Sequence, residues 1–197
     1  MKIDIDENIR KAKTIPSKFY YSRKIYKKLK KLFNRSWQFI GDTNLLEKNN
    51  AHPDILLEGM VDEPYVLTKS KEKIRCLSNV CTHRGTIVCE ESTKTKNLVC
   101  GYHGRQFGID GKMKFMPEFD DVENFPSSDD NLPEIEMESW KNLLFVINDK
   151  KCDLSELIQP MAKRLDWLPV DEFVYKPELS RTYKVNANWA LYCDNYL

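Results

Sequence analysis

Two short stretches of the sequence each place a histidine close behind a cysteine. The first is Cys81-Thr82-His83-Arg84-Gly85 and the second is Cys100-Gly101-Tyr102-His103-Gly104, with sixteen residues between His83 and Cys100. Each stretch offers one thiolate and one imidazole, and each ends in glycine, which lets the backbone turn tightly around a buried group. Thiolate and imidazole are ligands of transition metals. Together the two stretches would supply two sulfur and two nitrogen ligands.

Three interpretations of this pattern compete. The four side chains could be core residues that are neighbours by chance, but two Cys/His pairs that each end in glycine make chance a poor explanation. A structural zinc ion accepts the same ligands, although zinc fingers usually pair cysteine with cysteine and histidine with histidine. In a Rieske two-iron, two-sulfur cluster, two cysteines hold one iron and two histidines hold the other. The mixed pair in each stretch favours this cluster, because two such loops can clamp it from opposite sides.

The other cysteines do not indicate disulfide bonds. Residues 1–7 are charged from the second position and lack the apolar core of a signal peptide. In a cytoplasmic protein, the first interpretation of a cluster of cysteine and histidine is a metal site. The remaining cysteines are expected to be core or partly buried free thiols: Cys76, Cys89, Cys152 and Cys193.

The composition limits the class of protein and its partners. Of the 197 residues 41% are apolar and 31% are charged, and the 31 basic and 30 acidic residues leave a net charge of +1. This is enough apolar material for one or two folded domains, without the charge excess that would indicate a nucleic acid or an anionic membrane. No apolar run approaches the ~20 residues that span a bilayer. We therefore expect a cytoplasmic protein with neither a nucleic-acid nor a membrane partner.

The elements that must position the two Cys/His stretches are predicted to be short strands of a mainly β fold. Residues 37–150 are interpreted as an antiparallel β domain that contains both stretches. Its expected strands are 37–40, 64–68, 74–77, 97–100 and 143–147. Asp110-Gly111 is a hairpin signal between residues 107–109 and 112–114.

The flanking segments have a different character. Residues 1–36 are predicted to be helical, with eight basic and no acidic residues between Ser17 and Ser36. Residues 151–197 are interpreted as a linker and the beginning of an α+β domain. Its expected elements are a short helix at 154–158, strands at 172–175 and 181–185, and a helix from Asn188.

Two charged stretches have both a functional and a simpler interpretation. The basic helix could dock an acidic electron donor, but we favour a solvated helix face whose aromatic side packs on the domain. Residues 118–138 contain nine acidic residues and no basic one. We interpret them as an acidic surface loop, which is solvated or meets a basic surface of a neighbour in an oligomer.

Several motifs around these ligands carry a resemblance to a known family. They are Asn79–Gly85, Cys100–Phe107 with Asp110-Gly111, and Asn188-Trp189 with Asp194–Leu197. They resemble the Rieske-type ring-hydroxylating oxygenases, specifically the large (alpha) subunit, and the resemblance covers most of the chain from Trp37. It implies a Rieske-type antiparallel β domain with a 2Fe-2S cluster, in which Cys81 and Cys100 bind one iron and His83 and His103 bind the other. The family usually has proline at the position of Gly101 and often tryptophan at that of Arg105.

The resemblance is to the oxygenase branch and not to the respiratory one. Respiratory Rieske proteins carry an extra cysteine in each loop, joined as a disulfide, and the matching residues here are Thr86 and Tyr102. They also place a serine, which bonds a cluster sulfide, where this chain has Arg105. Fewer hydrogen bonds to the sulfurs predict a reduction potential in the lower part of the roughly −150 to +300 mV Rieske range.

Members of the family pass electrons to a mononuclear iron held by two histidines and one carboxylate, which activates O2. The chain has three histidines, and two of them are the expected cluster ligands, so only His52 is left for the mononuclear iron. One histidine cannot supply a two-histidine site, and we therefore assign no catalytic residue. In the family the iron ligands follow a helix of the type Asp/Glu-Asn-Tyr-Leu, with which this chain ends. We therefore interpret the chain as the N-terminal part of an alpha subunit, a fragment or a truncated product, with Fe(II) expected only in the full-length protein.

The expected function is electron transfer through the 2Fe-2S cluster of a hydroxylating or demethylating oxygenase, a monooxygenase or dioxygenase of aromatic compound catabolism. The resemblance implies a ferredoxin or a flavin/NAD(P)H reductase as electron donor, and a homotrimer when full length. The alternative is a free-standing Rieske ferredoxin-like electron carrier. The segments before Trp37 and after Ile147 argue against it, because such a carrier needs only the β domain.

Overall fold

The computed structural model describes residues 5–71 and 73–196. The chain divides into two units. One is Phe33–Lys176, and the other combines the chain before Phe33 with Pro177–Leu197. Among the described residues, no helix is long and apolar enough to cross a membrane.

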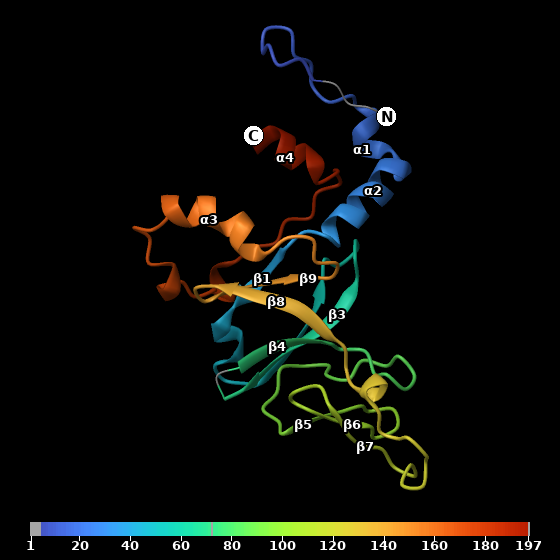
Figure 1. Ribbon diagram of the computed structural model, residues 1–197. Helices are drawn as coiled ribbons and strands as arrows, with labels where there is room; N and C mark the ends of the chain where they lie inside the picture. The colour runs from blue at the N-terminus through green and yellow to red at the C-terminus, as the bar shows by residue number, and fades with distance from the viewer. Residues whose placement is uncertain (1–4, 72, 197) are drawn as a thin grey trace. The chain divides into compact units, whose positions relative to one another are not determined.

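The larger unit is built around a six-stranded antiparallel sheet in the order β1-β9-β8-β4-β3-β2 (Figure 1). Its strands are β1 (Gln38–Asp42), β2 (Ala51–Leu56), β3 (Glu63–Ser70), β4 (Lys73–Ser78), β8 (Glu134–Trp140) and β9 (Leu143–Ile147). Four consecutive residues of β3, from Tyr65 to Thr68, are buried. Both faces of this strand are therefore covered, which fits the continuous apolar run that predicted it.

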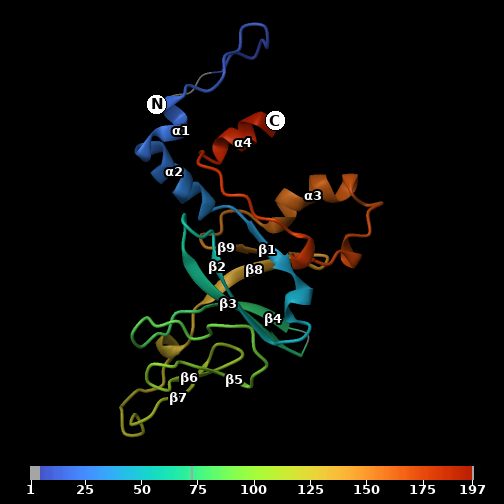
Figure 2. The ribbon, with the colours of Figure 1, turned by 180° about the vertical axis from the view of Figure 1, so that it is seen from behind.

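A second sheet carries the three short strands β5 (Asn97–Val99), β6 (Gln106–Gly108) and β7 (Met113–Phe115). It lies below β4 in the views of Figures 1 and 2. The hairpin predicted at Asp110-Gly111 joins β6 to β7, and Gly111 has the left-handed φ of +81° that this turn requires.

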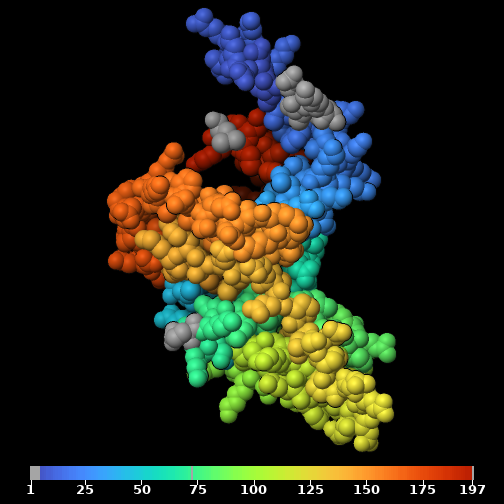
Figure 3. All heavy atoms as spheres, in the orientation of Figure 1, coloured from blue at the N-terminus to red at the C-terminus, as the bar shows by residue number. Residues whose placement is uncertain are grey.

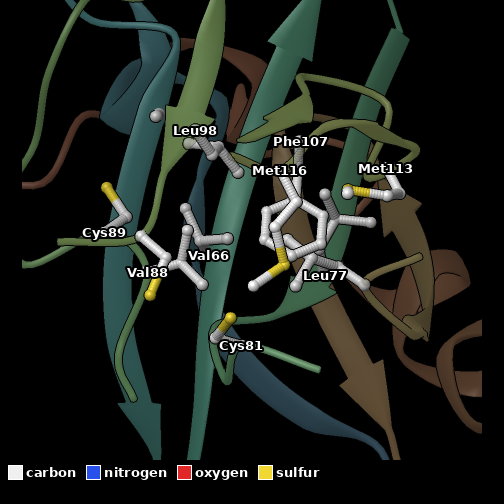
Figure 4. Close-up of a cluster of buried hydrophobic side chains, with 12 residues drawn as sticks. Val66, Leu77, Cys81, Val88, Cys89, Leu98, Phe107, Met113 and Met116 are labelled. Atoms are coloured by element: carbon white, nitrogen blue, oxygen red, sulfur yellow. The ribbon is translucent and has the colours of Figure 1, made fainter. Parts of the chain in front are cut away.

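A shared apolar core joins the two sheets. It takes Val66 and Leu77 from the large sheet and Leu98 and Phe107 from the small one, and Phe107 is completely buried. Figure 4 shows these side chains packed together, with Cys81 at the edge of the same cluster. The first Cys/His stretch is therefore anchored in the core that holds the sheets together.

A further core lies under α3 (Leu154–Arg164). Leu154 and Ile158 of this helix pack with Trp37, whose indole N–H donates to the Cys152 carbonyl oxygen at 3.0 Å. Figure 3 shows the orange atoms of α3 against the amber atoms of β8. Short 3-10 turns complete the unit: η1 (Thr43–Leu46), η2 (Ser128–Asp130) and η3 (Val170–Glu172).

The smaller unit is helical. It contains α1 (Lys18–Tyr21), most of α2 (Arg23–Phe33), η4 (Pro177–Leu179) and α4 (Ala190–Tyr196). The Tyr20 hydroxyl donates to the Asp194 carboxylate at 3.0 Å, and the Asn188 side chain donates to the Tyr20 carbonyl oxygen at 2.6 Å. These bonds tie the predicted final helix to the N-terminal basic helix, which is interrupted at Ser22.

The structure confirms the mainly β fold, the five predicted strands, the helix that begins at residue 154 and the final helix. The prediction of a helical segment over residues 1–36 holds only for Lys18–Tyr21 and Arg23–Phe33, because residues 5–17 form no helix and residues 1–4 lie outside the described residues.

Other predictions about local structure are wrong. Residues 172–175 and 181–185 form no strand, and the segment around His52, where no strand was predicted, is β2. The predicted acidic loop also ends early, because β8 begins at Glu134.

Candidate metal centre

The first Cys/His loop is closed by two backbone hydrogen bonds. The Cys81 N–H donates to the Thr86 carbonyl oxygen at 2.8 Å, and the Gly85 N–H donates to the Cys81 carbonyl oxygen at 2.9 Å. The loop follows β4 and is tied at its base by Asn79, whose amide oxygen accepts from the Cys89 N–H at 2.8 Å. The backbone between Cys81 and Thr86 is thus held in a tight turn.

The second loop, between β5 and β6, repeats this pattern. The Cys100 N–H donates to the Arg105 carbonyl oxygen at 2.8 Å, and the Gly104 N–H donates to the Cys100 carbonyl oxygen at 3.0 Å. Gly104 and its counterpart Gly85 have φ angles of +72° and +75°. Both loops therefore need glycine four residues after the cysteine, because other residues rarely adopt this left-handed backbone.

The two cysteines form the buried half of the site. Cys81 and Cys100 are 3% and 2% exposed. Burial raises the pKa of the Cys81 thiol, and the hydrogen-bonded side chain of Cys100 beside it raises that pKa further. Both cysteines belong to the same buried cluster, so the two thiols lie on the inner side of the site.

The two histidines form the outer half. The ring centroids of His83 and His103 lie 4.8 Å apart with an interplanar angle of 65°. His83 is half-buried and His103 is exposed. Burial lowers the pKa of His83, and the positive charges of His103, Arg84 and Arg105 lower it further. A lowered pKa favours the neutral form of the His83 ring, which can present a nitrogen to a metal.

The four side chains pair off as two sulfurs and two rings. Among the described residues, no three side chains of His, Cys, Asp or Glu converge on a position for one metal ion. A single tetrahedral zinc ion would need all four donors around one point. A two-iron cluster instead separates its thiolate ligands from its imidazole ligands, so this donor set fits such a cluster.

An ion pair that the sequence analysis missed lies beside the second loop. Arg105 is 3% exposed, and its guanidinium pairs with the Asp130 carboxylate. The Asp130 carbonyl oxygen accepts from the Thr82 hydroxyl of the first loop at 2.7 Å. Asp130 thus contacts both loops, although it belongs to the acidic stretch predicted to be a surface loop.

Asp130 itself is held by a local turn. The Ser127 N–H donates to its carboxylate at 2.8 Å, in a capping box at the start of η2. Hydrogen bonds from the Ser127 backbone and from Arg105 hold the pKa of Asp130 below its ordinary value. The only sequence signal for this turn is the Ser127-x-x-Asp130 spacing of a capping box, which does not indicate that Asp130 would face a metal loop.

The other cysteines and the third histidine lie outside the site. In Figure 4 Cys89 is on the far side of Val88 from Cys81. Cys76 is buried in a different apolar cluster and Cys152 is half-buried, as predicted for free thiols. Cys193 is exposed, so the prediction of partial burial is wrong for that residue.

His52 lies on β2 at the edge of the large sheet, where its Nδ1 is 2.7 Å from the Ser92 hydroxyl.

Comparisons with known proteins relate the chain to proteins with a Rieske domain. Residues 36–126 match the family described as Rieske [2Fe-2S] domain. The chain is 29% identical over 195 residues to the carnitine monooxygenase oxygenase subunit of Escherichia coli (strain K12), covering 96% of this chain and 51% of that protein. It is 24% identical over 197 residues to the chloroplastic choline monooxygenase of Beta vulgaris, covering 94% of this chain and 42% of that protein.

Solved structures give the same result. The quaternary ammonium Rieske monooxygenase CntA, in complex with an inhibitor, matches 94% of this chain and 52% of its own with a TM-score of 0.80 and 25% identity. The chain therefore spans about half the length of the relatives that it matches.

Proposed function

We propose, from the membership of this chain in the Rieske oxygenase alpha-subunit family, that it transfers electrons within an oxygenase through a 2Fe-2S cluster. The observation that carries this proposal is the grouping of the four donors into two thiols buried in one cluster and two adjacent imidazole rings. We assign Cys81 and Cys100 to one iron, and His83 and His103 to the other.

The bound cluster supplies one-electron oxidation and reduction. The residues around the proposed cluster leave one of its two sides exposed. The thiol side is buried in the core that joins the two sheets, whereas the ring of His103 is exposed. We propose that partners approach the imidazole side. The ring nitrogen of His83 or His103 that does not hold iron is available there to carry a proton.

We further propose that the chain acts as part of a monooxygenase whose substrate carries a quaternary ammonium group. The names of the relatives, carnitine and choline monooxygenase, support this class over the aromatic substrates that the family resemblance suggests. The mononuclear Fe(II) site and the substrate pocket belong to the full-length protein in this proposal, and this chain is not catalytically competent alone. A ferredoxin or a flavin/NAD(P)H reductase would donate electrons, and the full-length protein would form a trimer.

The length of the match supports an oxygenase subunit over a free-standing ferredoxin. The similarity to the Escherichia coli oxygenase subunit extends over 96% of the chain, whereas the Rieske domain itself covers residues 36–126. The segments on both sides of the domain thus have counterparts in an oxygenase.

Ligand substitutions test the site. We expect Cys81→Ser, His83→Asn, Cys100→Ser and His103→Asn each to lose acid-labile sulfide, iron and the EPR signal of the reduced cluster, because each removes one of the four anchors. Cys152→Ser and His52→Ala are matched controls from outside the loops, and they should keep all three. A wild-type chain that binds zinc without labile sulfide, or a Cys100→Ser variant with a full iron complement, would contradict the proposal.

A further inference from the structure

Arg105 is a buried cation placed directly at the metal loops. Its carbonyl oxygen closes the second loop by accepting from the Cys100 N–H at 2.8 Å, and it follows His103 by two residues. Its side chain is 3% exposed, and the guanidinium carbon lies 5.8 Å from the ring centroid of Phe107 and 5.5 Å from that of Phe125. Water therefore screens this charge little, and its field reaches the site.

The charge of Arg105 is only partly compensated. Its guanidinium pairs with Asp130, but its buried Nε–H has no hydrogen-bond partner among the described residues. The side chain of Asp130 is 22% exposed, so solvent weakens the field of the anion more than that of the cation. The ion pair therefore leaves a net positive potential around the buried Arg105 guanidinium.

We propose that the Arg105–Asp130 pair sets the reduction potential of the site. Arg105 supplies a fixed positive charge that favours the reduced state, and Asp130 offsets part of this charge while it joins the two loops. Both act as positioning and tuning residues, because neither is one of the four ligands. The inference rests on the proposed ligand set, since it concerns the cluster that those ligands hold.

The sign of the effect follows from charge alone. Reduction adds one electron to the site and breaks no bond, so the reduced state is more negative by one charge. A nearby cation stabilises that state and raises the potential, whereas a nearby anion lowers it. Arginine stays protonated over the accessible pH range, so its contribution does not titrate.

Potentiometric titration of the cluster-loaded chain, followed by EPR, tests the proposal. We expect Arg105→Gln to lower the equilibrium constant for reduction at least tenfold, which is ~59 mV for one electron. Arg105→Lys keeps the charge and should stay within threefold of wild type. Asp130→Asn removes the offsetting anion and should raise the constant at least threefold. Lys112→Gln, which removes the same charge from an exposed residue of the β6–β7 hairpin, should stay within twofold.

The outcomes separate this inference from the ligand assignment. A loaded wild type with an unshifted Arg105→Gln variant would overturn the role of Arg105 and leave the ligand set intact. A potential that falls in Asp130→Asn would also overturn the inference, and this variant decides the question if Arg105→Gln fails to load. A wild type without iron and labile sulfide would overturn the ligand assignment itself.

Discussion

Gly85 and Gly104 hold equivalent positions in the two metal loops. Each lies four residues after a proposed ligand cysteine, has a left-handed φ and donates its N–H back to the carbonyl oxygen of that cysteine. At the scale of single residues the site thus depends on backbone conformation as much as on donor atoms. The loops differ in where the histidine lies, two residues after Cys81 but three after Cys100.

Alanine substitutions should reveal this requirement. We expect Gly104→Ala to lower the free energy of unfolding by about 2 kcal/mol, because an L residue with this backbone costs about 1–2 kcal/mol. The new Cβ would also lie 3.3 Å from the Pro117 ring. Gly85→Ala has open space around it and should cost about 1 kcal/mol.

Gly101→Ala is the matched control, because Gly101 has open space and no left-handed φ. This variant should change stability by less than about 1 kcal/mol, in either direction. Urea denaturation of the three variants gives the comparison. Equal losses in Gly101→Ala and Gly104→Ala would rule out the conformational explanation.

At the scale of elements, the apolar pattern predicted most of the strands and failed where polar residues line a strand. β2 escaped prediction because His52-Pro53-Asp54 has the composition of a turn, yet Pro53 is tolerated since β2 is an edge strand. β8 was assigned to an acidic loop, although Ile135 and Met137 alternate with glutamates at the period of a strand. That alternation was a usable signal.

The small sheet depends on one buried aromatic ring. Phe107 on β6 is completely buried between the sheets, and we expect Phe107→Ala to cost about 3–5 kcal/mol and to weaken cluster binding. Phe115 on β7 is 45% exposed, so Phe115→Ala should cost less than about 1 kcal/mol and leave the cluster in place. Thermal unfolding and iron content measure both effects. Similar losses in the two variants would show that the small sheet is not anchored through Phe107.

At the scale of the whole molecule, the three clusters of buried apolar side chains found among the described residues lie within one unit. All their members fall between Phe33 and Lys176, as do the four proposed ligands. The ion pair between Arg35 and Asp149, at 2.8 Å, also lies inside these bounds. The metal centre therefore has its structural support within this unit.

We expect residues 33–176 expressed alone to fold cooperatively and to bind the cluster. The reduced EPR spectrum should match that of the whole chain, because no proposed ligand or core residue is removed. A fragment of residues 37–150 is the control. It lacks α3, whose Leu154 and Ile158 cover Trp37, and should unfold at a lower temperature. Failure of fragment 33–176 to bind iron that the whole chain binds would show that the helical unit contributes to the site.

The sequence by itself determined the candidate donor atoms, their division between two loops and the glycine that closes each loop, because these depend on residue type and local spacing. It also determined the principal strands, since a buried strand must be apolar. Only the tertiary structure brought Asp130 onto Arg105 and Thr82, 25 and 48 residues apart along the chain. Such a pairing leaves no local pattern, because it depends on which loop packs against which after the sheets have formed.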